Sequence, residues 1–163
     1  IQLARGATLD YFGTNVSAYK QQYSPTGPTS HTGPYTKSSN AAEDDWSDLI
    51  NLSYALSTST PDATYIQSVE QVANVDQFLK YCAVNSLIIN METTIATGVG
   101  DDYSSYRGVV DPRFQLINHD LDTVLGQGDA APSFTRSVFK AAELPVFDRL
   151  LKHPKIAPRY FLS

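Results

Sequence analysis

The chain has 163 residues, the length of one domain, and its 42% hydrophobic and 11% aromatic content is enough for a packed core. Its net charge of −5 argues against general binding to nucleic acids or other polyanions. The single cysteine, Cys82, excludes an internal disulfide framework and a zinc site built of several cysteines. No apolar run approaches the length of a membrane span. Because Cys82 lies in an apolar helical pattern, we expect a buried, inert thiol rather than a nucleophile.

The first forty residues give few signals of regular structure. Residues 1–22 are weakly patterned, and residues 23–40 are rich in Ser, Thr, Pro and Gly, with turn signals at Gly27-Pro28 and Gly33-Pro34. This composition predicts a long surface loop over 23–40. A linker between two domains is the alternative interpretation.

Three stretches between residues 43 and 88 have the apolar spacing of helices. The first carries an apolar stripe from Trp46 to Leu56, and Asn40 with Glu43 has the pattern of a capping box before it. The second covers 65–72 and the third covers 74–88. We therefore expect a mainly helical middle of the chain.

The third helix is the clearest of these. Asn74 is placed to cap it, with Gln77 as the reciprocal partner in a capping box. Its apolar face widens towards the end, so Asn85 and Asn90 sit in apolar surroundings, where an unpaired amide costs about 1–3 kcal/mol. We expect both to bond to neighbouring loop backbone, which would make the helix end a rigid platform.

A hairpin and a last helix follow. Residues 103–107 and 113–118 predict two strands joined by a short turn. Residues 143–151 predict the last helix, which Pro154 and Pro158 are expected to close off.

Acidic residues gather around this hairpin. The stretch 92–129 contains seven acidic residues and two basic ones. Asp120 and Asp122 follow the second strand, where side chains at i and i+2 would share a face, and Asp101-Asp102 precedes the first strand. Like charges this close are costly unless a cation neutralises them. Oxygen ligands that converge from two segments suit Mg²⁺ or Ca²⁺ better than a transition metal.

The order of these parts is that of protein kinases. A buried helix, a polar loop with acidic groups, a hairpin and then a metal-binding aspartate follow one another there. Phosphoryl transfer from a nucleoside triphosphate needs divalent cations that are held by oxygen ligands from two segments of the chain. It also needs a nearby carboxylate that orients the attacking hydroxyl. The acidic pairs before and after the hairpin are candidates for these cation ligands.

The same segments resemble the CotH kinase family, atypical kinase-like proteins associated with spore coats and common among secreted bacterial proteins. The resemblance runs from about residue 11 to the end and is strongest over 74–126. It rests on the residues 75–85, 100–103, 106–107 and 114–118, and on the motif Asn118-His119-Asp120-Leu121-Asp122. It implies an α+β fold, a mainly helical protein-kinase-like C-lobe in which a small β-hairpin carries a metal-binding Asp-x-Asp.

The resemblance also implies roles for single residues. Asp120 matches the metal-binding aspartate that corresponds to the kinase Asp-Phe-Gly motif, and Asp122 would be a second ligand or would orient the first. Asp102 stands where the family usually carries a metal-binding Asn, so an oxygen ligand is kept and a negative charge is added. His119, directly before Asp120, is the candidate for a contact with the nucleotide or the metal, although packing against the catalytic-loop backbone is the favoured interpretation of its position.

The catalytic carboxylate departs from the family pattern. The position of the family's catalytic Asp is occupied here by Thr97. Glu92 is the nearest carboxylate and is our candidate to orient the substrate hydroxyl, with Asp120 as its catalytic partner. Asp101 is the alternative to Glu92.

A kinase also needs a nucleotide-binding N-lobe with a phosphate-contacting lysine. Lys20 and Lys37 lie in loop-like sequence, and the chain starts at Ile1 without a methionine. We therefore expect residues 1–163 to be the C-lobe portion of a longer CotH-like kinase domain, inactive without its N-lobe. In the parent protein it would use ATP and Mg²⁺ or Mn²⁺, held by Asp102, Asp120 and Asp122.

The expected activity is transfer of the γ-phosphoryl group to Ser or Thr hydroxyls of a secreted or coat protein. The expected partners are that substrate and the N-lobe of the same chain, without nucleic acid or membrane. By resemblance, we expect the protein to be secreted or located at the cell surface or spore coat.

Two other functions compete with this one. A non-catalytic Ca²⁺-binding structural or adhesion module on a kinase-like scaffold is favoured by the irregular loop 93–100 and by Thr97. A phosphodiester or glycoside hydrolase that uses Glu92 with Asp120 is physically permissible, but no motif in the sequence supports it.

Overall fold

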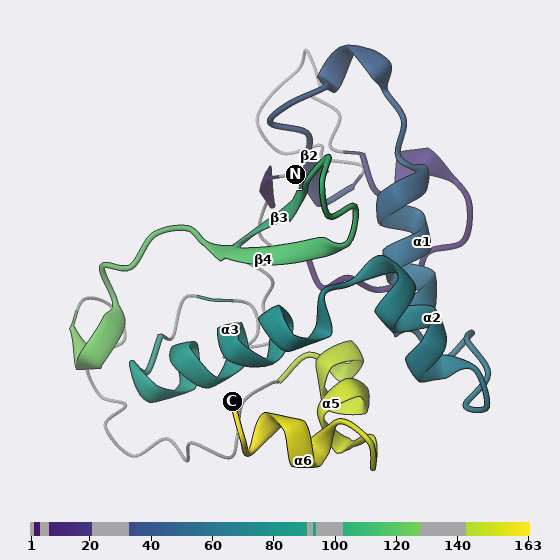
Figure 1. Ribbon diagram of the computed structural model, residues 1–163. Coiled ribbons are helices and arrows are strands. Elements are labelled where there is room, and N and C mark those ends of the chain that lie inside the picture. Colours follow the sequence, from purple (N-terminus) through teal and green to yellow (C-terminus); the bar gives the residue numbers. More distant parts are fainter. Residues whose placement is uncertain (1, 4–6, 21–32, 91–92, 94–102, 128–142) are drawn as a thin grey trace.

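The protein has a mixed α+β architecture, as the sequence predicts. The structure, a computed structural model, describes residues 2–3, 7–20, 33–90, 93, 103–127 and 143–163 (Figure 1). In chain order the elements are β1 (Gln2–Leu3), η1 (Val16–Ala18), β2 (Tyr35–Thr36), η2 (Ala41–Glu43), α1 (Ser47–Leu56), α2 (Tyr65–Val72), α3 (Val75–Leu87), β3 (Tyr103–Arg107), β4 (Phe114–Asn118), η3 (Val124–Gly126), α5 (Pro145–Lys152) and α6 (Ala157–Tyr160). Figure 1 shows α3 in the middle, between the β3–β4 hairpin and the C-terminal helices α5 and α6.

The strands form a small antiparallel sheet of order β2-β1-β3-β4. β3 and β4 are the predicted hairpin, paired from Tyr103 opposite Asn118 to Arg107 opposite Phe114. The register leaves the turn at one end of the hairpin and Asn118 at the other. The segment that follows Asn118, with Asp120 and Asp122, therefore leaves the sheet at its open end.

The structure differs from the predicted loop at its C-terminal part. Residues 21–32 lie outside the described residues, but Tyr35 belongs to strand β2 and is fully buried. Its hydroxyl accepts a hydrogen bond from the Leu9 backbone N–H at 2.8 Å. The phenol ring fills the core while its hydroxyl satisfies an irregular segment, so a residue in polar, turn-rich sequence becomes structural.

The helices confirm the predicted spacing, with two corrections. Asn40 does not begin α1, because its left-handed backbone (φ 54°) starts the separate turn η2 and its side chain makes no capping bond. The chain also does not stop being helical after α5. Pro158 lies in the first turn of α6, where a missing N–H costs no helical hydrogen bond.

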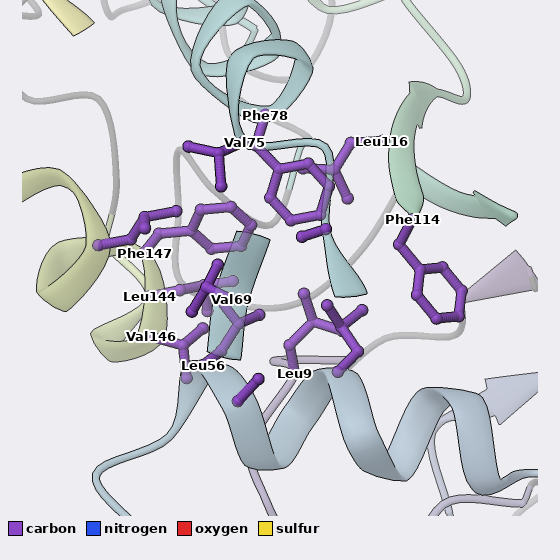
Figure 2. Packing of buried hydrophobic residues seen from close by; sticks show 14 of the residues in the cluster. Leu9, Leu56, Val69, Val75, Phe78, Phe114, Leu116, Leu144, Val146 and Phe147 are labelled. Carbon is purple, nitrogen blue, oxygen red and sulfur yellow. The ribbon is translucent and has the colours of Figure 1, made fainter. Parts of the chain in front are cut away.

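One apolar core joins these elements. Figure 2 shows Leu56 of α1, Val69 of α2, Phe78 of α3 and Phe147 of α5 packed together, with Leu116 of β4 nearby. The rings of Phe78 and Phe147 are 5.9 Å apart. Fully burying a side chain of this size contributes roughly 1.5–3 kcal/mol. This core fixes the side of α3 that faces α5, so α3 is held in place where the hairpin packs on it.

Cys82 lies on the buried face of α3. Only 1% of its surface is exposed, and burial raises the pKa of its thiol to about 12. A thiol with such a pKa stays protonated at neutral pH and is a poor nucleophile. The prediction of an inert, buried cysteine is confirmed.

Arginines attach the C-terminal helices to the rest of the fold. The Arg149 guanidinium donates to the Thr60 backbone oxygen at 2.9 Å and stacks 3.8 Å from the ring centre of Tyr65. Arg159 forms ion pairs of 2.7 Å with Glu70 and with Asp76.

None of the helices in the described residues is both long and apolar enough to cross a membrane.

Candidate functional site

The first turn of α3 holds the outer edge of β4. Asn74 caps the helix as predicted, because its Oδ1 accepts from the Gln77 backbone N–H at 3.2 Å. The Gln77 side chain, however, does not return to Asn74 as a capping box requires. Its Nε2 donates to the Leu116 backbone oxygen at 2.6 Å, and its Oε1 accepts from the Leu116 N–H at 2.8 Å. One glutamine amide thus takes the place of a neighbouring strand.

At the far end of α3 the prediction that Asn85 and Asn90 bond to loop backbone holds for Asn90, whereas Asn85 bonds to the helix backbone and to Asn90. Asn85 Nδ2 donates to the Tyr81 backbone oxygen at 2.8 Å, and Asn90 Nδ2 donates to Asn85 Oδ1 at 2.9 Å. Asn90 Oδ1 in turn accepts from the Thr93 N–H at 3.4 Å, and the Thr93 and Tyr81 hydroxyls are 2.9 Å apart. All four residues are buried. The two amides therefore bond to each other as well as to backbone, and they fix Thr93 against the helix.

The Asp-x-Asp motif lies in a turn. β4 ends at Asn118, and Asp120 has a left-handed backbone with φ 56°. The Asp122 N–H donates to Asp120 Oδ1 at 3.3 Å, a local bond that lets aspartate adopt this conformation. The prediction that both carboxylates share one face of a strand is therefore wrong. Both side chains are exposed beyond the strand end.

Two buried oxygens flank this turn. Asn118 Oδ1 and Thr123 Oγ1 have no hydrogen-bond partner within the described part of the chain. Buried polar atoms without a partner are rare in proteins, and an ordered water or ion is one common explanation. With Asp120 and Asp122 they supply oxygen atoms from one short segment, and oxygen is the ligand atom that Mg²⁺ and Mn²⁺ prefer. The two carboxylates are of the chemical type that such an ion prefers, but among the described residues no group of three His, Cys, Asp or Glu side chains is placed to hold a metal ion.

The other predicted site residues are not brought into this picture. Asp102, Glu92 and Asp101 lie outside the described residues, so their roles stay predictions. His119 is exposed and precedes Asp120 directly. Its predicted contact with the nucleotide also stays a prediction.

The opposite end of the hairpin contains a carboxylate of a different kind. Asp111 Oδ1 accepts from the Arg113 backbone N–H at 3.0 Å and from Arg113 Nε at 2.9 Å. Its Oδ2 accepts from Arg113 Nη2 at 2.8 Å and from Asn74 Nδ2 at 3.3 Å. The side-chain hydrogen bonds from Arg113 are the largest cause that lowers the pKa of Asp111, to about 2. This carboxylate closes the turn.

Two cavities in the described residues lie away from the motif. One, of about 270 Å³, lies beside the turn end of the hairpin, and Arg107 and Asp48 are among the residues that line it. The other, of about 620 Å³, lies between α2 and the residues 153–155. None of the predicted site residues lines either cavity.

Sequence reasoning missed three residues near the motif. Gln77 has a capping pattern, which concealed its bonds to a strand 39 residues away. Asn118 and Thr123 border the acidic motif in the sequence, so their oxygen side chains were a usable signal. Their burial was not visible without the fold.

Comparison with known proteins identifies the family of this chain. A search of curated proteins and a search of solved structures each gave no match. The family model described as CotH kinase protein matches residues 7–162, which include α3, the hairpin and the Asp120-Leu121-Asp122 turn. The chain therefore belongs to the CotH kinase protein family.

Proposed function

We propose that this chain is the C-lobe portion of a CotH-like kinase domain that transfers the γ-phosphoryl group of ATP to Ser or Thr hydroxyls of a protein. Membership of the family suggests a kinase-like function and the use of ATP. The observation that carries the proposal is the Asp120–Asp122 turn, which presents two exposed carboxylates between two buried oxygens without partners in the described residues. Such a turn is suited to hold a cation.

Asp120 and Asp122 would hold Mg²⁺ or Mn²⁺ together with Asp102. When bound, the ion supplies positive charge to the phosphate oxygens, whose negative charge otherwise repels the attacking group. Asn118, two residues before Asp120, has a further neutral oxygen that is buried and without a partner in the described residues. His119, exposed beside Asp120, would contact the nucleotide.

Glu92 is the proposed group that orients the substrate hydroxyl and accepts its proton. Its neighbours in the chain support this role, since Asn90 and Thr93 are fully buried and hydrogen-bonded to the end of α3. Asp101 is the alternative base.

The proposed partners are a protein substrate with Ser or Thr hydroxyls and the N-lobe of the parent chain. The N-lobe would supply the phosphate-contacting lysine that neither Lys20 nor Lys37 provides by sequence pattern. The association of this family with spore coats supports a secreted or coat protein as substrate.

Intact mass measurement tests this function. The parent protein with its upstream region is incubated with ATP and Mg²⁺ or Mn²⁺, beside the variants Asp120→Asn and Asp62→Asn. Asp62 is a matched control, because it is an exposed carboxylate remote from the hairpin and asparagine keeps an acceptor for Arg149. Added phosphate in the wild type and Asp62→Asn, but not in Asp120→Asn, is the expected result. Absence of added phosphate in all three proteins would contradict the proposal.

A Ca²⁺-binding structural module is the second candidate. One observation favours it: Asn118, Asp120, Asp122 and Thr123 belong to one continuous segment, and Ca²⁺ loops draw their ligands from such segments. A Ca²⁺ module binds its ion without ATP. A rise in melting temperature with Ca²⁺ alone, without phosphate transfer, would favour this candidate.

A further inference from the structure

The segment 116–125, which contains the Asp-x-Asp turn, is hydrogen-bonded at both of its ends to α3 or to the residue that follows it. On one side, the Gln77 side chain in the first turn of α3 holds both backbone groups of Leu116. On the other side, the Leu125 N–H donates to the backbone oxygen of Ile88, the residue that follows α3, at 2.7 Å. Figure 1 shows β4 along α3 and η3 near the far end of that helix. The segment that contains the turn is thus attached near the beginning and near the end of α3.

The lengths of the two connections explain the shape of the turn. Gln77 and Ile88 are separated by about 16 Å along a helix axis that rises 1.5 Å per residue. The chain from Leu116 to Leu125 can span up to about 30 Å when extended. The excess length has to be taken up by turns, and both Asp120 and Leu125 have left-handed backbones with φ 56°. The two anchors therefore limit the region in which the carboxylates can lie.

The two anchors differ in chemistry. The bond at Leu125 joins two backbone groups, whereas the anchor at Leu116 depends on one side chain. A glutamine amide has a donor and an acceptor in the geometry of a peptide group, so it can pair with both groups of Leu116. A methionine of similar length keeps the packing and offers neither partner. A single substitution can thus remove the side-chain bonds between α3 and Leu116, while β4 stays paired with β3 and the Asn74 N–H still donates to the Phe114 backbone oxygen.

We propose that Gln77 is a positioning residue for Asp120 and Asp122, which it places through strand β4. The metal part of this proposal rests on the proposed kinase function. Loss of the two Gln77 bonds loosens the contact of the paired β3–β4 hairpin with α3, so the two carboxylates meet an ion in a broader range of geometries. Substitution of a residue that orients a metal ligand typically changes the metal affinity by 10–100-fold.

The test compares Gln77→Met with Asn74→Ala in the parent protein. Asn74→Ala removes the cap of the same helix end but keeps the Gln77 side chain on Leu116. Both variants are assayed for the Mn²⁺ dependence of phosphate transfer and for hydrogen exchange of the peptide segment 117–125. We expect Gln77→Met to raise the Mn²⁺ concentration for half-maximal transfer roughly tenfold, with a smaller change in kcat at saturating Mn²⁺. Exchange over 117–125 should become faster in Gln77→Met and stay unchanged in Asn74→Ala.

The two proposals can fail separately. If Gln77→Met and Asn74→Ala have the same Mn²⁺ dependence and the same exchange over 117–125, Gln77 only stabilises the fold and the positioning role is overturned. Phosphate transfer by the wild type would still support the kinase function in that case. If the wild type transfers no phosphate, the kinase function fails, and the exchange comparison alone decides the role of Gln77. Faster exchange in Gln77→Met only would support it, and equal exchange would overturn it.

Discussion

The two ends of the β3–β4 hairpin carry aspartates in opposite environments. At the turn end, Asp111 receives four hydrogen bonds, three from Arg113 and one from Asn74. At the open end, Asp120 accepts one bond from the Asp122 backbone, and neither carboxylate forms an ion pair among the described residues. A carboxylate whose acceptor sites are filled by its own chain is structural, and one whose sites face solvent is available to a ligand.

Neutralising each aspartate is the strongest way to break this comparison. We expect Asp120→Asn to lower the rate of phosphate transfer in the parent protein by roughly two orders of magnitude or more, because a ligand charge next to the phosphates is lost. Asp111→Asn should retain most of the rate, since it affects only the turn. Steady-state assays of phosphate incorporation compare the two variants. Equal losses in both would show that the two ends do not differ in function.

Both ends depend on α3, so damage to its core should affect them together. Phe78 is fully buried against Phe147. Phe78→Ala should lower the free energy of unfolding by about 3–5 kcal/mol, through lost burial and the cavity left behind. Denaturant unfolding measures this change, with Lys80→Ala on the exposed side of the same helix as control. A loss for Lys80→Ala as large as that for Phe78→Ala would contradict the central role of this helix face.

The smallest effect concerns the pH dependence of the turn end. Arg113 lowers the pKa of Asp111 from its ordinary value of 3.8 to about 2, so the folded protein binds fewer protons there than the unfolded chain. This contribution to stability is complete above about pH 4 and is lost as the pH falls towards 2. Urea unfolding between pH 5 and pH 3 should therefore change less steeply with pH in Asp111→Asn than in the wild type. Parallel curves for the two proteins would rule out this role of Asp111.

The regular elements were predictable because their signal is local. The apolar spacing gave α2 its observed bounds, and the alternation of side chains gave the hairpin. β1 and β2 contain two residues each, too few for any periodic pattern. Pro158 looked like the end of a helix, although a proline is equally at home in a first turn.

The acidic residues of the candidate site stand out in the sequence, but the geometry of the segment that carries them does not. Asp120 and Asp122 stand out as a pair of acids after an apolar run, yet the left-handed turn at Asp120 departs from the expected strand. Gln77 satisfies a local rule in the sequence and a distant strand in the fold, and no local pattern reveals which strand will lie beside a helix. The roles of Asp102 and Glu92, outside the described residues, remain predictions.

Binding of Mn²⁺ tests the central claim most directly, that the open end of the hairpin holds a cation and the turn end does not. The parent protein, Asp120→Asn and Asp111→Asn are titrated with Mn²⁺ in the presence of ATP, and the free ion is followed by electron paramagnetic resonance with an ATP-only blank. We predict that the wild type and Asp111→Asn bind Mn²⁺ with equal affinity and that Asp120→Asn binds at least roughly tenfold more weakly. Equal affinity of all three proteins would contradict the claim.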